Sequence, residues 1–133
     1  MATQVQKIEN RFPQRILQAD GICELILGAG LILESQTLAS WLGINAIALE
    51  VGGVIVLAFG AWLLYISQRN ASRQVLQVIA VLNIACVALV GLLLVLDWNT
   101  LANEGRWALE FASDVFLMLG IVEFYARRFV VSL

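Results

Sequence analysis

The sequence predicts an all-α membrane protein, a bundle of four transmembrane helices with both termini in the cytoplasm. The chain has 133 residues, of which 61% are hydrophobic and only 14% charged. A soluble domain is about half apolar and a quarter charged. Four apolar runs also reach the length, about twenty residues, that a helix needs to cross a bilayer. We place them at about 16–33, 44–66, 75–96 and 107–125. Residues 1–133 are therefore expected to form a single membrane domain.

The basic residues predict the orientation. Of the eight Lys and Arg residues, only Arg106 falls between the first and second or the third and fourth runs. The other seven fall on the opposite side, which the positive-inside rule makes cytoplasmic. We therefore expect a multi-pass protein of the cell (inner) membrane. The seven residues are Lys7, Arg11, Arg15, Arg69, Arg73, Arg127 and Arg128.

Residues 1–15 predict a short basic amphipathic segment. Val5, Ile8 and Phe12 recur on one helical face, and basic residues recur every four positions from Lys7 to Arg15. Such a segment can lie on an anionic lipid surface. Ordinary flanking charge of the positive-inside kind is the simpler interpretation of the same residues.

The first apolar run carries two acids on one face. Asp20 and Glu24 are four residues apart, and Gly28 continues the same side. Asp20 lies close enough to the basic flank to pair with Arg15 or Arg127. Glu24 lies about 12 Å into the run at 1.5 Å per residue, out of reach of any basic residue on its own helix. We expect it to be protonated, hydrogen-bonded across helices or facing water.

The second and third runs carry signals of helix packing. Small residues recur at seven-residue intervals at Ala46, Gly53, Gly60 and Ser67, which lets a partner helix approach closely in a left-handed crossing. Asn83, near the middle of the third run, is expected to hydrogen-bond a neighbouring helix. The segment Glu34–Gly43 between the first two runs is expected to be a short outer loop.

The last apolar run contains three acids, which are costly in lipid. Glu110 follows Arg106 by four residues, and Glu123 precedes Arg127 by four, so we expect two ion pairs at the membrane interfaces. Asp114 is deeper and has no basic neighbour. The candidate intramembrane polar site therefore comprises Glu24, Glu50, Asn83, Glu110 and Asp114.

The second and fourth runs resemble each other at an offset of sixty residues. At this offset Gly53 aligns with Ser113, another small residue. At an offset of fifty-nine, one residue less, Glu24 of the first run aligns with Asn83 of the third. The two halves start on the same side of the membrane, so they would be parallel repeats of a helix hairpin. In that case the second and fourth runs would pack through Gly53/Ser113 and Gly60/Gly120. The identities are Ala48/Ala108, Leu49/Leu109, Glu50/Glu110, Leu57/Leu117, Gly60/Gly120 and Tyr65/Tyr125.

Short motifs also carry a resemblance. They are Ala19-Asp20-Gly21, Gly28, Leu42-Gly43-Ile44, Gly52, Leu64-Tyr65, Asn83 and Arg127-Arg128. On these motifs the chain resembles a loose group of small uncharacterised bacterial four-transmembrane-helix integral membrane proteins. The resemblance implies a four-helix bundle and no particular activity. Cys86 departs from that group, which tends to have an aromatic residue three positions after the asparagine.

The composition argues against catalysis. The chain has no histidine, which excludes imidazole as a haem ligand, metal ligand or acid–base catalyst. Cys23 and Cys86 form no CxxC pair. We therefore expect no enzyme activity, no cofactor and no metal site.

Two functions remain open. The first is an accessory or interaction subunit of a membrane complex, or a homo-oligomer; its partners would be the lipid bilayer and other membrane subunits or further copies, with no nucleic acid. The alternative is a small proton- or cation-coupled transporter or channel that uses its intramembrane carboxylates. Each unpaired acid at depth costs about 2.5–3.5 kcal/mol on insertion scales. A proton relay needs its acids on inward faces of the bundle, whereas a subunit can turn one outward to a partner.

Overall fold

The computed structural model describes residues 11–69 and 71–130, and this part of the chain is all-α, with no β-strand. The predicted all-α class is therefore confirmed. Residues 1–10, which hold most of the predicted amphipathic segment, lie outside the described residues. The elements are α2 (Phe12–Leu33), α3 (Ser35–Leu42), α4 (Ala46–Arg69), α5 (Arg73–Leu96), α6 (Asn103–Ala126) and the short 3-10 helix η1 (Arg127–Phe129).

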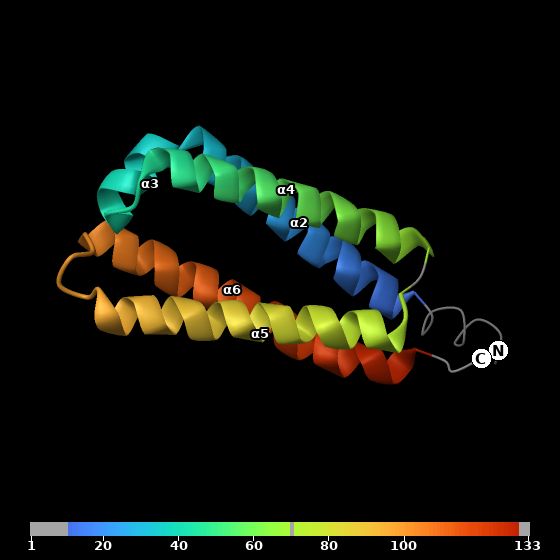
Figure 1. The fold of residues 1–133 in the computed structure, drawn as a ribbon. Helices are drawn as coiled ribbons and strands as arrows, with labels where there is room; N and C mark the ends of the chain where they lie inside the picture. Colours follow the sequence, from blue (N-terminus) through green and yellow to red (C-terminus); the bar gives the residue numbers. More distant parts are fainter. Residues whose placement is uncertain (1–10, 70, 131–133) are drawn as a thin grey trace.

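The four long helices form two antiparallel hairpins that lie side by side (Figure 1). In one hairpin α2 packs along α4, and in the other α5 packs along α6. The hairpins contact each other mainly through α2 and α6, with a smaller contact between α3 and α6. The start of α2 and the end of α6 lie at one end of the bundle, and α3 lies at the other (Figure 1).

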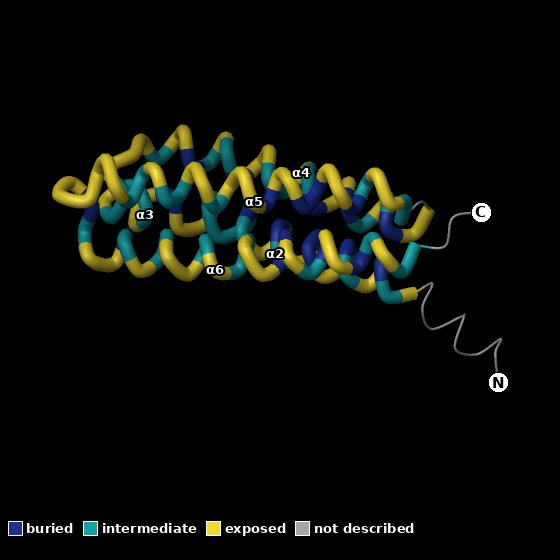
Figure 2. The backbone as a smooth tube through the Cα atoms, turned by 90° about the horizontal axis from the view of Figure 1, so that it is seen from below, coloured by how far each residue is buried: buried dark blue, intermediate teal, exposed yellow. Residues whose placement is uncertain are grey.

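The hydrophobic core lies at the end of the bundle where α2 starts, which we call the core end (Figure 2). Its buried residues come from all four long helices: Leu17, Leu63, Leu76, Ile79 and Ala126. Elsewhere the helices turn large apolar side chains outward, a pattern typical of helices surrounded by lipid. Examples of these exposed side chains are Ile26, Ile55, Leu89 and Val95.

Three helices, α2, α4 and α5, are long and apolar enough to cross a membrane. These three helices support the prediction of a multi-pass membrane protein. Helix α6 is equally long but is not among the three. Its sequence differs because Glu110, Asp114 and Glu123 interrupt the apolar run.

The segment predicted as an outer loop is instead largely the helix α3. Leu38, Trp41 and Leu42 recur at helical spacing and let this short helix pack on α4 and α6. Gly43 ends the helix with a φ of 67°, the left-handed conformation that glycine adopts without steric cost. The expectation of a simple loop was wrong because an eight-residue amphipathic stretch is short enough to be missed beside two long apolar runs.

Glycines bring α2 and α4 into backbone contact at two levels. A Cβ atom added to Gly28 would lie 2.8 Å from the carbonyl oxygen of Gly53, and one added to Gly60 would lie 2.9 Å from that of Gly21. Any larger residue would push the two backbones apart. Small residues at helix interfaces stabilise membrane bundles because they permit such close packing.

The expected contact between the second and fourth runs is not formed. Gly53 and Gly60 face α2, whereas Gly120 faces Ala80 of α5. Each stripe of small residues therefore packs against the other helix of its own hairpin. The nearest chain neighbour takes the contact because a short connection makes antiparallel pairing the least costly arrangement.

Alanine substitution should test the glycine contact. Gly28→Ala and Gly53→Ala should each lower the free energy of unfolding in detergent by about 1–3 kcal/mol, because the added methyl group overpacks the interface. Gly30→Ala and Gly52→Ala are matched controls, since an added Cβ there meets nothing within 4 Å. They should be neutral or stabilising by up to about 1 kcal/mol through helix propensity. Equal losses of unfolding free energy at the tested glycines and at the control glycines would contradict the close backbone contact between α2 and α4.

Candidate functional site

Three polar side chains from three helices meet inside the bundle near its core end. Asp20 of α2 and Glu123 of α6 are fully buried, and Asn83 of α5 is 2% exposed. The side-chain nitrogen Nδ2 of Asn83 donates to Oδ2 of Asp20 at 3.2 Å and to Oε2 of Glu123 at 2.9 Å. We call these three residues the buried triad. One amide group thus links both hairpins.

Small residues beside the triad allow its helices to come together. Glu123 lies on the same buried face of α6 as Gly120 and Ala126, one turn to either side. A Cβ added to Gly120 would lie 3.2 Å from the carbonyl oxygen of Ala80 and 3.4 Å from Cβ of Asn83. The backbones of α5 and α6 are therefore close enough for the short asparagine side chain to reach Glu123.

Both acids of the triad retain an oxygen with no partner. Oδ1 of Asp20 and Oε1 of Glu123 are buried, and neither makes a hydrogen bond within the described residues. Because both accept from the same NH₂ group, the two carboxyl groups lie side by side. None of the described basic side chains forms an ion pair with either acid. Two acids in apolar surroundings are thus held by a single amide donor group.

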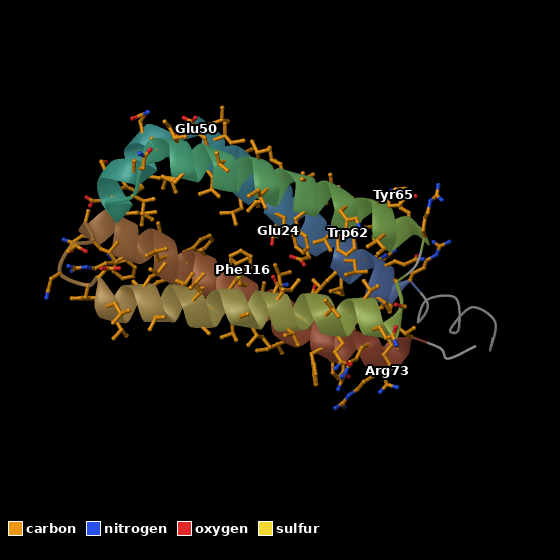
Figure 3. All side chains as sticks on the ribbon, in the orientation of Figure 1. Glu24, Glu50, Trp62, Tyr65, Arg73 and Phe116 are labelled. Atoms are coloured by element: carbon orange, nitrogen blue, oxygen red, sulfur yellow. The ribbon has the colours of Figure 1, made fainter. Side chains whose placement is uncertain are left out.

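Glu24 lies beside the triad and inside the bundle. It is 6% exposed and follows Asp20 by one helical turn on the same face. Figure 3 shows it on the side of α2 that faces the α5–α6 hairpin. It also packs against α4, because a Cβ on Gly60 would lie 3.0 Å from Cβ of Glu24. Of the five residues of the predicted polar site, Glu24 and Asn83 are therefore brought to the interior.

The other three residues of the predicted site lie elsewhere. Glu50 is half-buried near α3, where its Oε1 accepts a hydrogen bond from Oγ of Ser35 at 2.9 Å (Figure 3). Glu110 and Asp114 are exposed on the face of α6 that points away from the bundle. The five residues do not form one site. We expected Asp114 to be able to face inward, but the rotation of α6 puts Gly120 and Glu123 on the inward face instead.

The expected interface ion pairs are also not formed. Glu123 meets Asn83 and Asp20 inside the bundle, while Arg127 donates to Oε1 of Gln77 at 3.2 Å and lies 3.6 Å from the ring centre of Phe124. The four-residue spacing of Glu123 and Arg127 predicted a surface pair because it ignored the crossing of α6 with α5. Instead of pairing with Arg127, Glu123 is buried and accepts a hydrogen bond from the amide of Asn83.

At the other end of α6, Arg106 turns back toward the preceding turn rather than toward Glu110. Its guanidinium group stacks over the ring of Trp98 at 4.3 Å and donates to the carbonyl oxygen of Trp98 and to Asn103. The backbone turn before α6 thus offers Arg106 closer acceptors than the carboxylate one turn along the helix. Glu110 is left on the outward face.

The outward face of α6 combines these two acids with large apolar side chains. Trp107 is 72% exposed, Phe111 is 73% exposed and Met118 is 60% exposed. Glu110 and Asp114 lie among them on the same face. Asp114 is halfway along this 24-residue helix. We call these five residues the outer α6 face.

The sequence predicts ion pairs with arginines for both Asp20 and Glu123, and it does not indicate that the two acids are partners of Asn83. A signal for Glu123 was present. Gly120 and Ala126 flank it at three-residue spacing, and small residues on both sides of an acid are typical of a close helix crossing.

No family model, curated protein or solved structure matches this chain. The resemblance to small bacterial four-helix membrane proteins therefore stays a prediction. Within residues 11–69 and 71–130, no group of three or more Cys, Asp or Glu side chains is arranged to hold a metal ion.

Asn83→Ala should destabilise the bundle by about 1–3 kcal/mol, because it leaves two buried carboxyl groups without their donor. Gln77→Ala is the matched control on the same helix, since it removes an exposed hydrogen bond to Arg127; its effect should stay within about 0.5 kcal/mol. The free energy of unfolding in mild detergent is the measurement. If Asn83→Ala lowered the free energy of unfolding no more than Gln77→Ala does, the buried triad would not stabilise the bundle.

Proposed function

We propose that this protein is a four-span membrane helix bundle that acts as an interaction subunit and binds another membrane protein along the outer α6 face. The observation that carries the proposal is the outward exposure of Glu110 and Asp114. Helix α6 has the 24 residues needed to span the bilayer and runs antiparallel beside α5. As the fourth span it would complete two hairpins and leave both chain termini on the cytoplasmic side of the membrane.

The free-energy cost of an intramembrane acid favours a partner protein over the outer α6 face. An acid at the centre of a span costs about 2.5–3.5 kcal/mol on insertion scales, and Asp114 lies at that depth. Acyl chains offer it no hydrogen-bond donor. A partner helix with a donor side chain at the same depth would offset this cost, and the exposed aromatic side chains of Trp107 and Phe111 would add apolar contact area.

The partner is proposed to be a different protein rather than a second copy. All eight basic residues of this chain lie near the ends of its apolar runs, so a second copy presents no cation at the depth of Asp114. Asn83 is already used inside the bundle. A helix with a basic or amide side chain near its middle has the complementary chemistry.

The alternative, a proton- or cation-coupled transporter, has less support. Its acids would need to line one path through the bundle. Asp20, Glu24 and Glu123 gather near the core end, but Glu50 is bonded near α3 and Asp114 faces outward. This arrangement favours a local buried site over a relay across the membrane.

The hairpins are proposed to be parallel repeats. Gly60 of α4 faces Gly21 and Glu24 of α2, while Gly120 of α6 faces Ala80 and Asn83 of α5. These contacts are equivalent at offsets of sixty and fifty-nine residues. The likeness of packing supports the duplication more than the six sequence identities do, because it relates contacts rather than isolated positions.

Photo-crosslinking in the native membrane should map the partner. A benzophenone amino acid at Phe111 or Met118 should form one discrete adduct with another membrane protein, because both positions flank Asp114. The same probe at Val51 or Ile55, exposed on α4, is the control and should react with lipid only. Equal protein adducts from both helices, or none from α6, would contradict the proposal.

A charge-removing variant should test the chemistry of the contact. Asp114→Asn should reduce the amount of partner that copurifies in mild detergent, because a neutral amide accepts a weaker hydrogen bond from a basic or amide donor than a carboxylate does. The mass and composition of the purified particle are the measurement. Glu104→Gln, an exposed acid in the first turn of α6, is the control and should leave the particle unchanged. A particle that contains only copies of this chain would contradict the hetero-partner.

A further inference from the structure

The buried triad holds more acceptor atoms than donors. The NH₂ group of Asn83 has two hydrogens and gives one to each carboxyl group. Oδ1 of Asp20 and Oε1 of Glu123 remain unpartnered and fully buried. Because one NH₂ group donates to both, the two carboxyl groups lie side by side. Two ionised carboxylates accept hydrogen bonds only and repel each other, so a proton shared between them would satisfy the remaining oxygens and stabilise this arrangement.

We propose that Asp20 and Glu123 form a proton-binding site that holds one shared proton in this closed arrangement of the hairpins. The O–H of one carboxyl group donates to an oxygen of the other, while Asn83 donates to both. The proton then satisfies a buried oxygen that no side chain reaches. The proposal does not depend on the outer α6 face, which lies on the other side of the helix.

The groups around the pair favour its singly charged state over the doubly charged one. On α2, Glu24 lies one turn away and adds negative charge. On α5, Cys86 lies one turn from Asn83 and within electrostatic reach of Asp20. On α6, Arg127 follows Glu123 by one turn but is engaged by Gln77 and Phe124.

Helix α4 adds no charge to this region. Its buried residues at the core end are Gly60, Leu63 and Ser67, and the hydroxyl group of Ser67 donates to the carbonyl oxygen of Leu64. No cation from the described helices therefore compensates a second negative charge on the pair. A proton is the ligand that fits the chemistry of this site.

Loss of the proton should loosen the contact between the hairpins. The hairpins meet mainly through α2 and α6, and Asp20 and Glu123 lie in that contact. Removing the proton leaves two negative charges side by side in apolar surroundings, which repel and gain by moving toward water. The closed arrangement of the hairpins is therefore stable while the proton is bound, and it weakens as the pH rises and the pair loses the proton.

Infrared spectroscopy of the full chain in lipid bilayers tests the proton directly. The wild-type protein should show a protonated-carboxyl C=O band that disappears as the pH is raised. This component should be missing from Asp20→Asn/Glu123→Gln, in which a neutral amide pair of the same shape replaces the acids. Asp114→Asn is the control and should retain it. A wild-type spectrum without such a component, or one in which the double variant keeps it, would overturn the proposal.

Distance measurement tests the coupling to the hairpins. Spin labels at Ile22 and Ile121, exposed on α2 and α6, are introduced after Cys23 and Cys86 are replaced by alanine. With the acids intact, the distance distribution should shift to longer values as the pH rises. With Asp20→Asn/Glu123→Gln it should stay short at every pH. A shift of equal size in both proteins, or none with the acids intact, would contradict the coupling.

Discussion

The acyl chains of a bilayer cannot hydrogen-bond to a protein, and this constraint organises the whole structure. Each polar side chain within an apolar helix must find its partner inside the bundle or in another protein. Asp20, Asn83 and Glu123 find one another, and α2, α5 and α6 are thereby joined. Asp114 finds nothing inside, because the rotation that buries Glu123 turns Asp114 outward. The same helix rotation therefore creates both the buried triad and the outer α6 face.

Two kinds of contact hold the bundle together, and they differ in character. Within the first hairpin, backbone approaches backbone at Gly28 and Gly53, so dispersion and close packing stabilise it. Between the hairpins the contact is narrower and includes a polar network. A network of this kind is sensitive to the protonation of its members, whereas the glycine contact is not. The hairpins are thus expected to behave as stable units whose relative position can change.

Much of the fold could be predicted from the sequence. The four apolar runs correspond closely to α2, α4, α5 and α6, because length and hydrophobicity are properties of the chain alone. The stripe at Gly53 and Gly60 indicated a close helix contact but not its partner, which depends on packing. Glu24 and Asn83 were recognised as candidate interior residues, and both are buried.

The rest depended on helix rotation, which the sequence does not determine. Glu123 was paired with Arg127 because their spacing fits a surface ion pair, yet the crossing of α6 and α5 buries it against Asn83. The sequence pattern permits Asp114 to face inward, because it does not relate the position of one acid on α6 to that of another. Only one face of α6 can point inward, and Gly120 marks that face, since an added Cβ there would crowd Ile84 and Ala80 of α5.

We infer that another protein covers the outer α6 face in the membrane. A cryo-electron microscopy structure of the particle purified from its native membrane in mild detergent tests it most directly. We expect polypeptide density of a second protein along α6, with a basic or amide side chain within hydrogen-bonding distance of Asp114. Lipid or detergent density over that face, with Asp114 still pointing outward, would contradict it.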